Sequence, residues 1–171
     1  MKSRKPSRAA AAGRARDADK PTRATRTSAP IITADELRRA IFELANTLAP
    51  GDVDDLLGTE DDLRERAARM DGERRKLFAA QLEIAIMCLR DHAGGLCPQI
   101  PYFTISMLAA ALAYLIDDLD VIPDFLPRIG TLDDALVMAM AFQLAEDGLR
   151  RYCIWKEIDL TPALVAPSAW H

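Results

Sequence analysis

The chain has 171 residues, of which 50% are hydrophobic and 28% charged, and its formal net charge is −4. This length gives room for one domain with a hydrophobic core, and the composition is that of a globular protein. Aromatic and β-branched residues are sparse, whereas Ala, Leu, Arg, Asp and Glu are abundant. The composition therefore favours helices packed on helices.

Charge is divided unevenly along the chain. Residues 1–30 carry nine Lys and Arg side chains against two acidic ones, a net charge of +7, whereas residues 31–171 carry 13 basic and 24 acidic side chains, a net charge of −11. The first segment mixes Ala, Arg, Ser, Thr and Pro without apolar periodicity, so we expect a disordered basic arm. Its partner should be anionic, either a membrane surface or, without sequence preference, a nucleic acid.

The compartment predicted from the sequence is the cytoplasm. The basic start is followed by Ala, Thr and Ser rather than by the apolar run of a secretory signal. Three cysteines, Cys88, Cys97 and Cys153, form no C-x-x-C pair and are odd in number. Reduced, buried thiols are the expected state.

A helical domain is expected over residues 31–160, and its first helix should begin after Thr33. Thr33 and Glu36 have the spacing of a capping box, in which each side chain accepts a hydrogen bond from the backbone of the other residue. Pro50-Gly51 should end this helix. Its apolar face is formed by residues at helical spacing: Leu37, Ile41, Leu44 and Leu48.

Two further helices are expected before residue 95. After a short acidic segment at 52–58, Thr59 is predicted to cap a charged helix that ends near Met70. A longer helix should follow over residues 73–91, and Gly94-Gly95 should close it.

The next segment, 102–116, has no charged residue and no hydrophilic face, which is typical of a helix at the centre of a core or in a membrane. Its fifteen residues would span only about 22 Å, less than the roughly 30 Å of a bilayer's hydrocarbon core. A single helix is predicted over 132–158, and an irregular tail over 161–171. The expected fold is therefore all-α, with about five helices and a central apolar hairpin joined by a corner rich in Pro and Asp.

Residues 110–134, AALAYLIDDLDVIPDFLPRIGTLDD, include this corner and six aspartates. A buried carboxylate is costly unless it is capped, paired or bound to a metal. In the structural interpretation, Pro123 and Pro127 hold an extended corner and Gly130 adopts positive φ. Asp133 and Asp134 then lie in the first turn of the next helix, where the helix dipole favours negative charge.

The aspartates at the other side of the corner need a different partner, because the C-terminus of a helix disfavours carboxylates. Arg128 is the only cation in the sequence between Arg90 and Arg150, so it is predicted to pair with Asp120 or Asp124. The alternative is a hard-cation site, since oxygen ligands suit Mg²⁺ or Ca²⁺. Its ligands would be Asp117, Asp120, Asp124, Asp133 and Asp134.

The corner resembles the YkvA family, small helical domains of unknown function. The residues that carry the resemblance are Tyr114, Asp120, Ile122-Pro123-Asp124, Leu126-Pro127, Gly130 and Leu132-Asp133-Asp134. They cover about 35 residues at fixed spacings. The resemblance implies a helical fold and, often, membrane association, and it brings no agreed activity.

The function expected from the sequence is that of a non-enzymatic helical module, peripheral to a membrane or bound to a protein partner. Catalytic signatures are missing: the sequence has no G-x-S-x-G motif, no phosphate-binding glycine loop and no set of zinc ligands. No cofactor is expected beyond the divalent cation of the alternative, a cation-binding protein or enzyme that uses the aspartates at 117–134. The oligomeric state is left open.

Overall fold

The computed structural model describes residues 33–70, 72–116 and 131–164, without the side chains of residues 73 and 131–133. Within these ranges the chain is all-α and contains no strand. Its elements, in chain order, are α1 (Ala34–Thr47), α2 (Asp52–Leu57), α3 (Glu60–Ala68), α4 (Gly72–Ala93), α5 (Tyr102–Leu115), α6 (Thr131–Leu144), α7 (Glu146–Lys156) and the 3₁₀ turn η1 (Thr161–Ala163).

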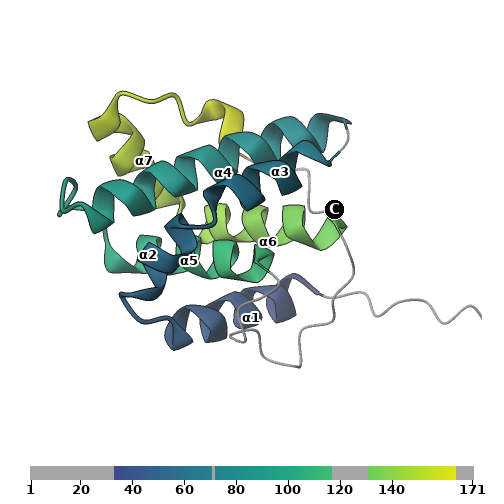
Figure 1. The fold of residues 1–171 in the computed structure, drawn as a ribbon, viewed down its shortest axis with the longest axis horizontal. Helices are drawn as coiled ribbons and strands as arrows, with labels where there is room; N and C mark the ends of the chain where they lie inside the picture. The colour runs from purple at the N-terminus through teal and green to yellow at the C-terminus, as the bar shows by residue number, and fades with distance from the viewer. Residues whose placement is uncertain (1–32, 71, 117–130, 165–171) are drawn as a thin grey trace, which may run out of the picture.

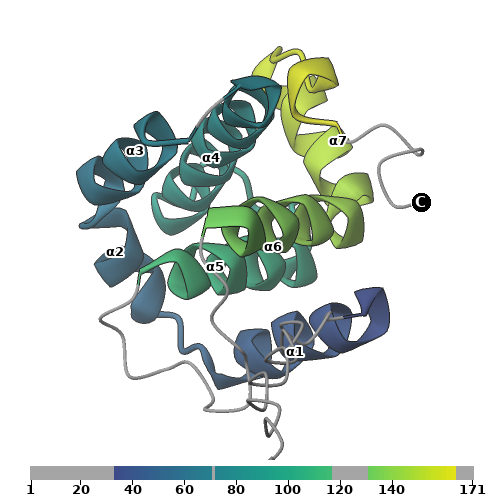
Figure 2. The same cartoon turned by 90° about the vertical axis from the view of Figure 1, so that its right-hand side faces the viewer.

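The two most apolar helices, α5 and α6, lie side by side at the centre (Figures 1 and 2). α1 packs on one side of this pair and α4 on the other. The short helices α2 and α3 lie beside α4, and η1 packs on α4 as well. The predicted apolar hairpin is therefore the centre of the core. Its middle stretch, Leu108 to Ala113, is at most 2% exposed at every position.

α1 begins as the sequence predicts. The Thr33 hydroxyl accepts a hydrogen bond from the Glu36 amide at 3.2 Å, and the Glu36 carboxylate accepts one from the Thr33 amide at 2.8 Å. The residues on its inner face, Leu37, Ala40, Ile41, Leu44 and Ala45, are buried. The capping box thus fixes the start of the helix, and the apolar face fixes its orientation.

Between α1 and α4 the structure differs in two details from what the sequence predicts. The acidic segment after Gly51 is a helix, α2, because Val53 and Leu56 are buried in the core and the carboxylates of its first turn lie at a helix N-terminus. Thr59 occupies the N-cap position of α3, as predicted, but its side chain makes no capping hydrogen bond. Its hydroxyl instead donates a 2.8 Å hydrogen bond to the carbonyl oxygen of Leu56, so it stabilises the end of α2.

The single helix predicted over 132–158 is two helices, α6 and α7, separated at Ala145 (φ −92°, ψ 2°). A tertiary contact explains why α7 takes its own direction. A Cβ atom at Gly148 would lie 1.8 Å from the Thr104 hydroxyl oxygen of α5, so α7 approaches the start of α5 more closely than any side chain allows. The first residues of the tail predicted over 161–171 form the turn η1, which packs on α4 and buries Ala163.

Candidate functional site

Of the aspartate-rich segment 110–134, the structure describes residues 110–116 and 131–134, which belong to α5 and α6. Residues 117–130 lie outside the described ranges. Tyr114 is partly buried near the end of α5 and packs against the core. Asp133 and Asp134 lie in the first turn of α6, and the side chain of Asp133 is outside the description. The other residues predicted for the site all lie within 117–130, outside the described residues: Asp117, Asp120, Pro123, Asp124, Pro127, Arg128 and Gly130. The predicted pairing of Arg128 stays a prediction.

Asp134 is bound by an arginine from a distant part of the chain. Its side chain is 2% exposed, and Arg66 of α3 approaches it with two nitrogens, Nε to Oδ2 at 2.7 Å and Nη2 to Oδ1 at 3.1 Å. The third nitrogen of Arg66, Nη1, donates to the carbonyl oxygen of Leu115 at 2.7 Å. This oxygen belongs to the last turn of α5, where carbonyl groups have no partner within the helix.

One guanidinium group therefore connects the end of α5 to the beginning of α6. The position of α3 makes this possible, because Leu63 and Ala67 are buried in the core and Arg66, on the same helix, is carried toward the hairpin. A planar guanidinium matches a carboxylate with two parallel hydrogen bonds, and a buried carboxylate requires such a partner. We name Arg66, Asp134 and the Leu115 carbonyl the hairpin clasp.

Sequence reasoning missed Arg66. It lies 68 residues before Asp134, in a helix whose many charged residues predict a position on the surface. The one local signal is its place between Leu63 and Ala67, beside the apolar stripe of α3, where a long arginine stem can cover apolar surface and reach inward. Nothing in the spacing of residues 60–68 indicates which carboxylate it meets.

A second buried polar group joins α4 to α7. The Asp91 carboxylate accepts hydrogen bonds from the Tyr152 hydroxyl at 2.7 Å and from Lys156 Nζ at 2.6 Å. Burial alone would raise the pKa of Asp91, but the bonds from Lys156 and Tyr152 outweigh it and hold the pKa of the carboxyl below its usual value. Burial, together with donation to Asp91, raises the pKa of Tyr152. Tyr152 therefore stays protonated and acts as a hydrogen-bond donor.

The three thiols are free and buried, as expected from the sequence. Burial raises the pKa of all three, Cys88, Cys97 and Cys153. A thiol is nucleophilic as its thiolate, so these cysteines have the properties of core residues rather than of reactive groups.

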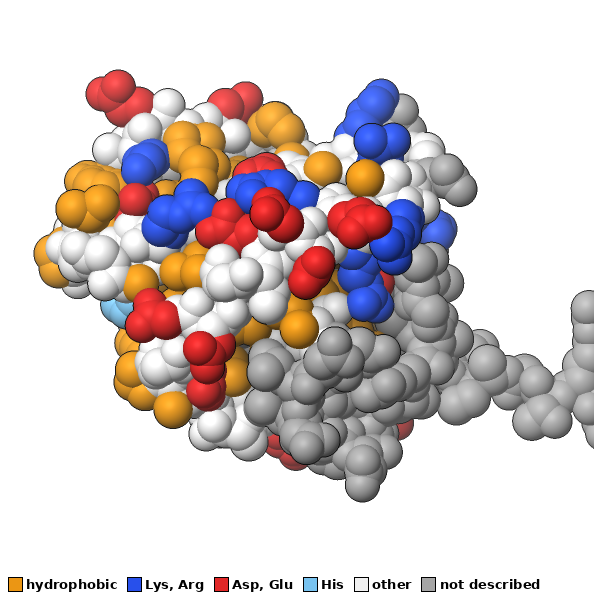
Figure 3. Space-filling view, viewed as in Figure 1, with side chains coloured by type: hydrophobic (Ala, Val, Ile, Leu, Met, Phe, Trp, Pro, Cys, Tyr) orange, Lys and Arg blue, Asp and Glu red, His pale blue; other side chains and the backbone are white. Residues whose placement is uncertain are grey.

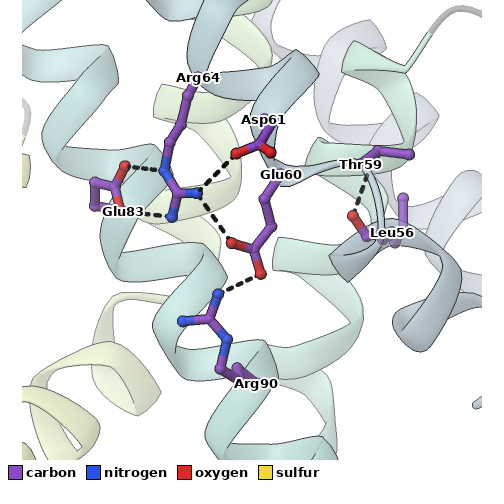
Figure 4. A network of polar contacts seen from close by, with 7 residues as sticks. All are labelled: Leu56, Thr59, Glu60, Asp61, Arg64, Glu83 and Arg90. Atoms are coloured by element: carbon purple, nitrogen blue, oxygen red, sulfur yellow. Dashed lines mark hydrogen bonds and ion pairs between the residues drawn. The ribbon is translucent and has the colours of Figure 1, made fainter.

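On the surface, an ion-pair network holds α3 against α4 (Figure 4). Arg64 contacts Glu83 at 2.8 Å and Glu60 at 3.0 Å, and Glu60 also binds Arg90. Burial opposes ionisation of Glu60, but hydrogen bonds from Arg90 and Arg64 hold its pKa below the usual value. The charged face that the sequence predicts for α3 is therefore used partly for packing on α4.

The cation site predicted at the corner is not tested by the described residues. Among them, no group of three or more His, Cys, Asp or Glu side chains is arranged to hold a metal ion. Of the five predicted ligands, only Asp134 has a described side chain, and both of its oxygens accept hydrogen bonds from Arg66. A cation at Asp134 would have to compete with the guanidinium group. Metal binding through the remaining aspartates stays a prediction.

Five large hydrophobic side chains are exposed, and we name them the apolar end. Figure 3 shows hydrophobic side chains gathered at the left of the molecule, where Figure 1 places the connection between α4 and α5. Leu96 belongs to that connection, Tyr102 and Phe103 to the start of α5, and Ile154 and Trp155 to α7. Their exposures range from 41% to 78%.

Comparison with known proteins identifies the class. The family model described as "Protein of unknown function (DUF1232)" matches residues 104–140, which include most of α5, the corner and most of α6. The chain is also 31% identical, over 84 residues, to the "Uncharacterized membrane protein YkvA" of Bacillus subtilis (strain 168). This match covers 49% of the chain and 79% of the relative. The chain belongs to the YkvA-like family, as its corner motif predicts. No solved structure matches it.

The relative is named a membrane protein, and this bears on the helices of the present chain. In the parts of the chain that the structure describes, none of the helices is both long and apolar enough to cross a membrane. α5, with 14 residues, is about 21 Å long. α4 is longer, with 22 residues, and carries charged residues along its length.

Proposed function

We propose that this protein is a non-enzymatic helical module that attaches to a membrane surface without inserting its apolar hairpin. The observation that carries the proposal is the burial of α5, whose residues from Met107 to Ala113 are almost wholly covered by other helices. A hairpin that is enclosed by α1 and α4 is the core of a folded domain. Membrane attachment, which the name of the relative suggests, then has to use the surface of this domain or the basic arm.

The basic arm supplies the long-range part of this attachment. Residues 1–30 carry a net charge of +7, whereas the rest of the chain is acidic and is repelled by an anionic surface. Each Lys or Arg near an anionic leaflet contributes about 1 kcal/mol, and added salt screens the attraction. The arm should therefore bring the acidic domain to the membrane and hold it there at low ionic strength.

Fractionation of cells that express the full chain tests the proposal. We expect the protein in the membrane fraction, with partial release by high salt and full release by alkaline carbonate. A variant that begins at Ile31 serves as the comparison and should lose the salt-sensitive part of the binding. Retention of the full chain through carbonate would contradict a peripheral attachment.

A protein partner and, for the arm, non-specific nucleic acid are the alternatives to a membrane surface. A full chain found wholly in the soluble fraction would overturn membrane attachment and favour one of these. Binding of RNA or DNA that disappears with residues 1–30 would identify the nucleic acid, since the log of such an affinity falls linearly with the log of the salt concentration.

A further inference from the structure

We propose that the apolar end is the surface of this protein that enters the interface of a lipid bilayer, an inference that rests on the membrane attachment proposed above. The apolar end consists of Leu96, Tyr102, Phe103, Ile154 and Trp155. Exposed apolar side chains scattered singly are ordinary, whereas a group of them at one end of a molecule marks a contact surface.

Asp91 connects α7, which carries Ile154 and Trp155, to the turn after α4, which carries Leu96. Its carboxylate binds Tyr152 and Lys156 of α7. Its backbone carbonyl accepts a 2.8 Å hydrogen bond from the Leu96 amide. The same residue thus contacts both α7 and the turn after α4, so the end of α7 lies beside the turn that carries Leu96.

Two side chains of the apolar end contact neighbouring rings before any partner arrives. The Phe103 ring lies 5.8 Å from the Phe42 ring of α1, and the Trp155 ring lies 5.9 Å from the Tyr152 ring, measured between ring centres. Side chains that are already ordered lose little conformational entropy on binding. Phe103 and Trp155 are therefore positioned for contact without a rearrangement of their rings.

The residue types favour a lipid interface. Tyr and Trp have an apolar ring and a polar group, and both are enriched where the hydrocarbon of a bilayer meets its headgroups. Leu96, Phe103 and Ile154 supply purely apolar surface beside them. Lys156 Nζ, which is also bound to the Asp91 carboxylate, lies 5.6 Å from the centre of the Trp155 ring, so a cation lies beside this aromatic side chain.

The size of the apolar end argues against a second copy of the chain as its partner. Five large side chains exposed by 41% to 78% present roughly 500 Å², given 150–250 Å² for a fully covered aromatic side chain. A stable protein–protein interface uses about 800 Å² on each partner. A shallow insertion among headgroups has no such minimum, because its strength grows with the apolar area and with the charge nearby.

Vesicle binding of the full-length protein tests the inference. The vesicles are phosphatidylcholine with a minor fraction of phosphatidylglycerol, and the salt is about 0.5 M, where screening removes most of the arm's attraction. The variants are Leu96→Asp, Ile154→Asp and the pair together. Ala68→Asp is the control, because it puts the same charge on an exposed alanine of α3, outside the apolar end.

We expect the double variant to bind these vesicles at least roughly tenfold more weakly than the parent, because inserting a carboxylate in place of an apolar side chain is unfavourable. The affinity of each single variant should lie between those of the parent and the double variant. Ala68→Asp should bind like the parent. Circular dichroism and the melting temperature should be unchanged in every variant, since all three positions are exposed.

Fluorescence gives a second, independent readout. Trp170→Phe leaves Trp155 as the only tryptophan of the chain. Its emission should shift to shorter wavelength on vesicle binding and should be quenched by lipids brominated near the headgroup end of the acyl chain. Binding without any shift or quenching would overturn the inference.

The outcomes separate this inference from the proposed function. If the parent binds and the double variant binds equally well, the apolar end is not the contact surface, while membrane attachment stands. If the parent binds no vesicle in low or high salt, both proposals fail. A parent that is dimeric in solution, with a double variant that is monomeric, would assign the apolar end to a second copy of the chain and overturn the lipid assignment.

Discussion

At the scale of single residues, two buried carboxylates, those of Asp91 and Asp134, are bound by partners that are distant in the sequence. Arg66 binds Asp134 and the Leu115 carbonyl, and Asp91 binds Tyr152 and Lys156. Each group stabilises a connection between helices rather than a single helix. Loss of one partner should therefore affect the stability of the whole domain.

Arg66→Ala is predicted to lower the free energy of unfolding by about 3 kcal/mol, because it leaves a buried carboxylate and a helix-end carbonyl without partners. Urea denaturation followed by circular dichroism measures the change. Arg69→Ala is the matched control, since Arg69 forms an exposed pair with Glu65 on the same helix, for which a loss of about 0.5 kcal/mol is expected.

The double variant Arg66→Met with Asp134→Leu should recover most of the stability lost in Arg66→Ala. Replacement of a buried ion pair by apolar residues is often neutral, whereas removal of one partner is not. Equal stability of Arg66→Ala and the parent would show that the hairpin clasp does not hold the two helix ends.

The second prediction concerns pH. The pKa of Asp91 is held below its usual value in the folded protein, so its ionised form stabilises the fold above the unfolded-state pKa of about 3.9, and this contribution is lost as the pH falls through the folded-state pKa. Asp91→Asn should cost about 1–3 kcal/mol near pH 7. The difference between the parent and the variant should shrink below about pH 4.

Urea denaturation of the parent and of Asp91→Asn at several pH values between neutrality and about pH 3 measures this difference. A difference that stays constant over the whole range would mean that the hydrogen bonds, and not the charge of Asp91, carry the stabilisation.

At the scale of elements, the position of α7 depends on a glycine. Gly148 lies against Thr104 so closely that a Cβ atom would meet the hydroxyl oxygen at 1.8 Å and the Thr104 Cβ at 2.8 Å. This contact places the start of α7 on the first turn of α5. It also explains why the helical pattern of residues 132–158 is divided: the division lets both α6 and α7 pack on α5.

Gly148→Ala is therefore predicted to destabilise the protein by at least about 2 kcal/mol, although alanine favours helices more than glycine does. Thermal unfolding followed by circular dichroism measures the loss. Adding Thr104→Ala should restore part of it, because the hydroxyl and methyl groups are removed while the Cβ remains. Gly51→Ala is the control, since a Cβ atom at that position meets nothing within 4 Å. A Gly148→Ala variant as stable as Gly51→Ala would contradict the close contact.

At the scale of the whole molecule, the acidic domain and the basic arm have separate tasks in the proposed function. α1 begins with a capping box formed by Thr33 and Glu36, which satisfies its first backbone groups locally. A chain that begins at Ile31 is therefore predicted to melt within about 2 °C of the full chain. Differential scanning calorimetry of the two forms measures this. A much lower melting temperature would move the predicted domain boundary toward the N-terminus.

Much of the fold could be predicted from local patterns. The start of α1, the extent of α4 and α5, and the apolar hairpin at the centre follow from a capping box, from helical spacing and from uncharged runs. The family followed from the corner motif, whose residues recur at fixed spacings. The structure has seven α-helices within its described ranges, against about five predicted, because α2 was not predicted as a helix and α6 and α7 were predicted as a single one.

The sequence by itself determined the all-α class, the central hairpin and the family, because these depend on composition, periodicity and residues close together in the chain. Only the tertiary structure decided which groups meet and which stay exposed: that Arg66 binds Asp134, that Gly148 admits α7 onto α5, and that five large apolar side chains remain on the surface. Such contacts join residues tens of positions apart, and many pairings are compatible with the same pattern. Packing of the helices selects one of them, because buried charges and apolar surfaces must all find partners at once.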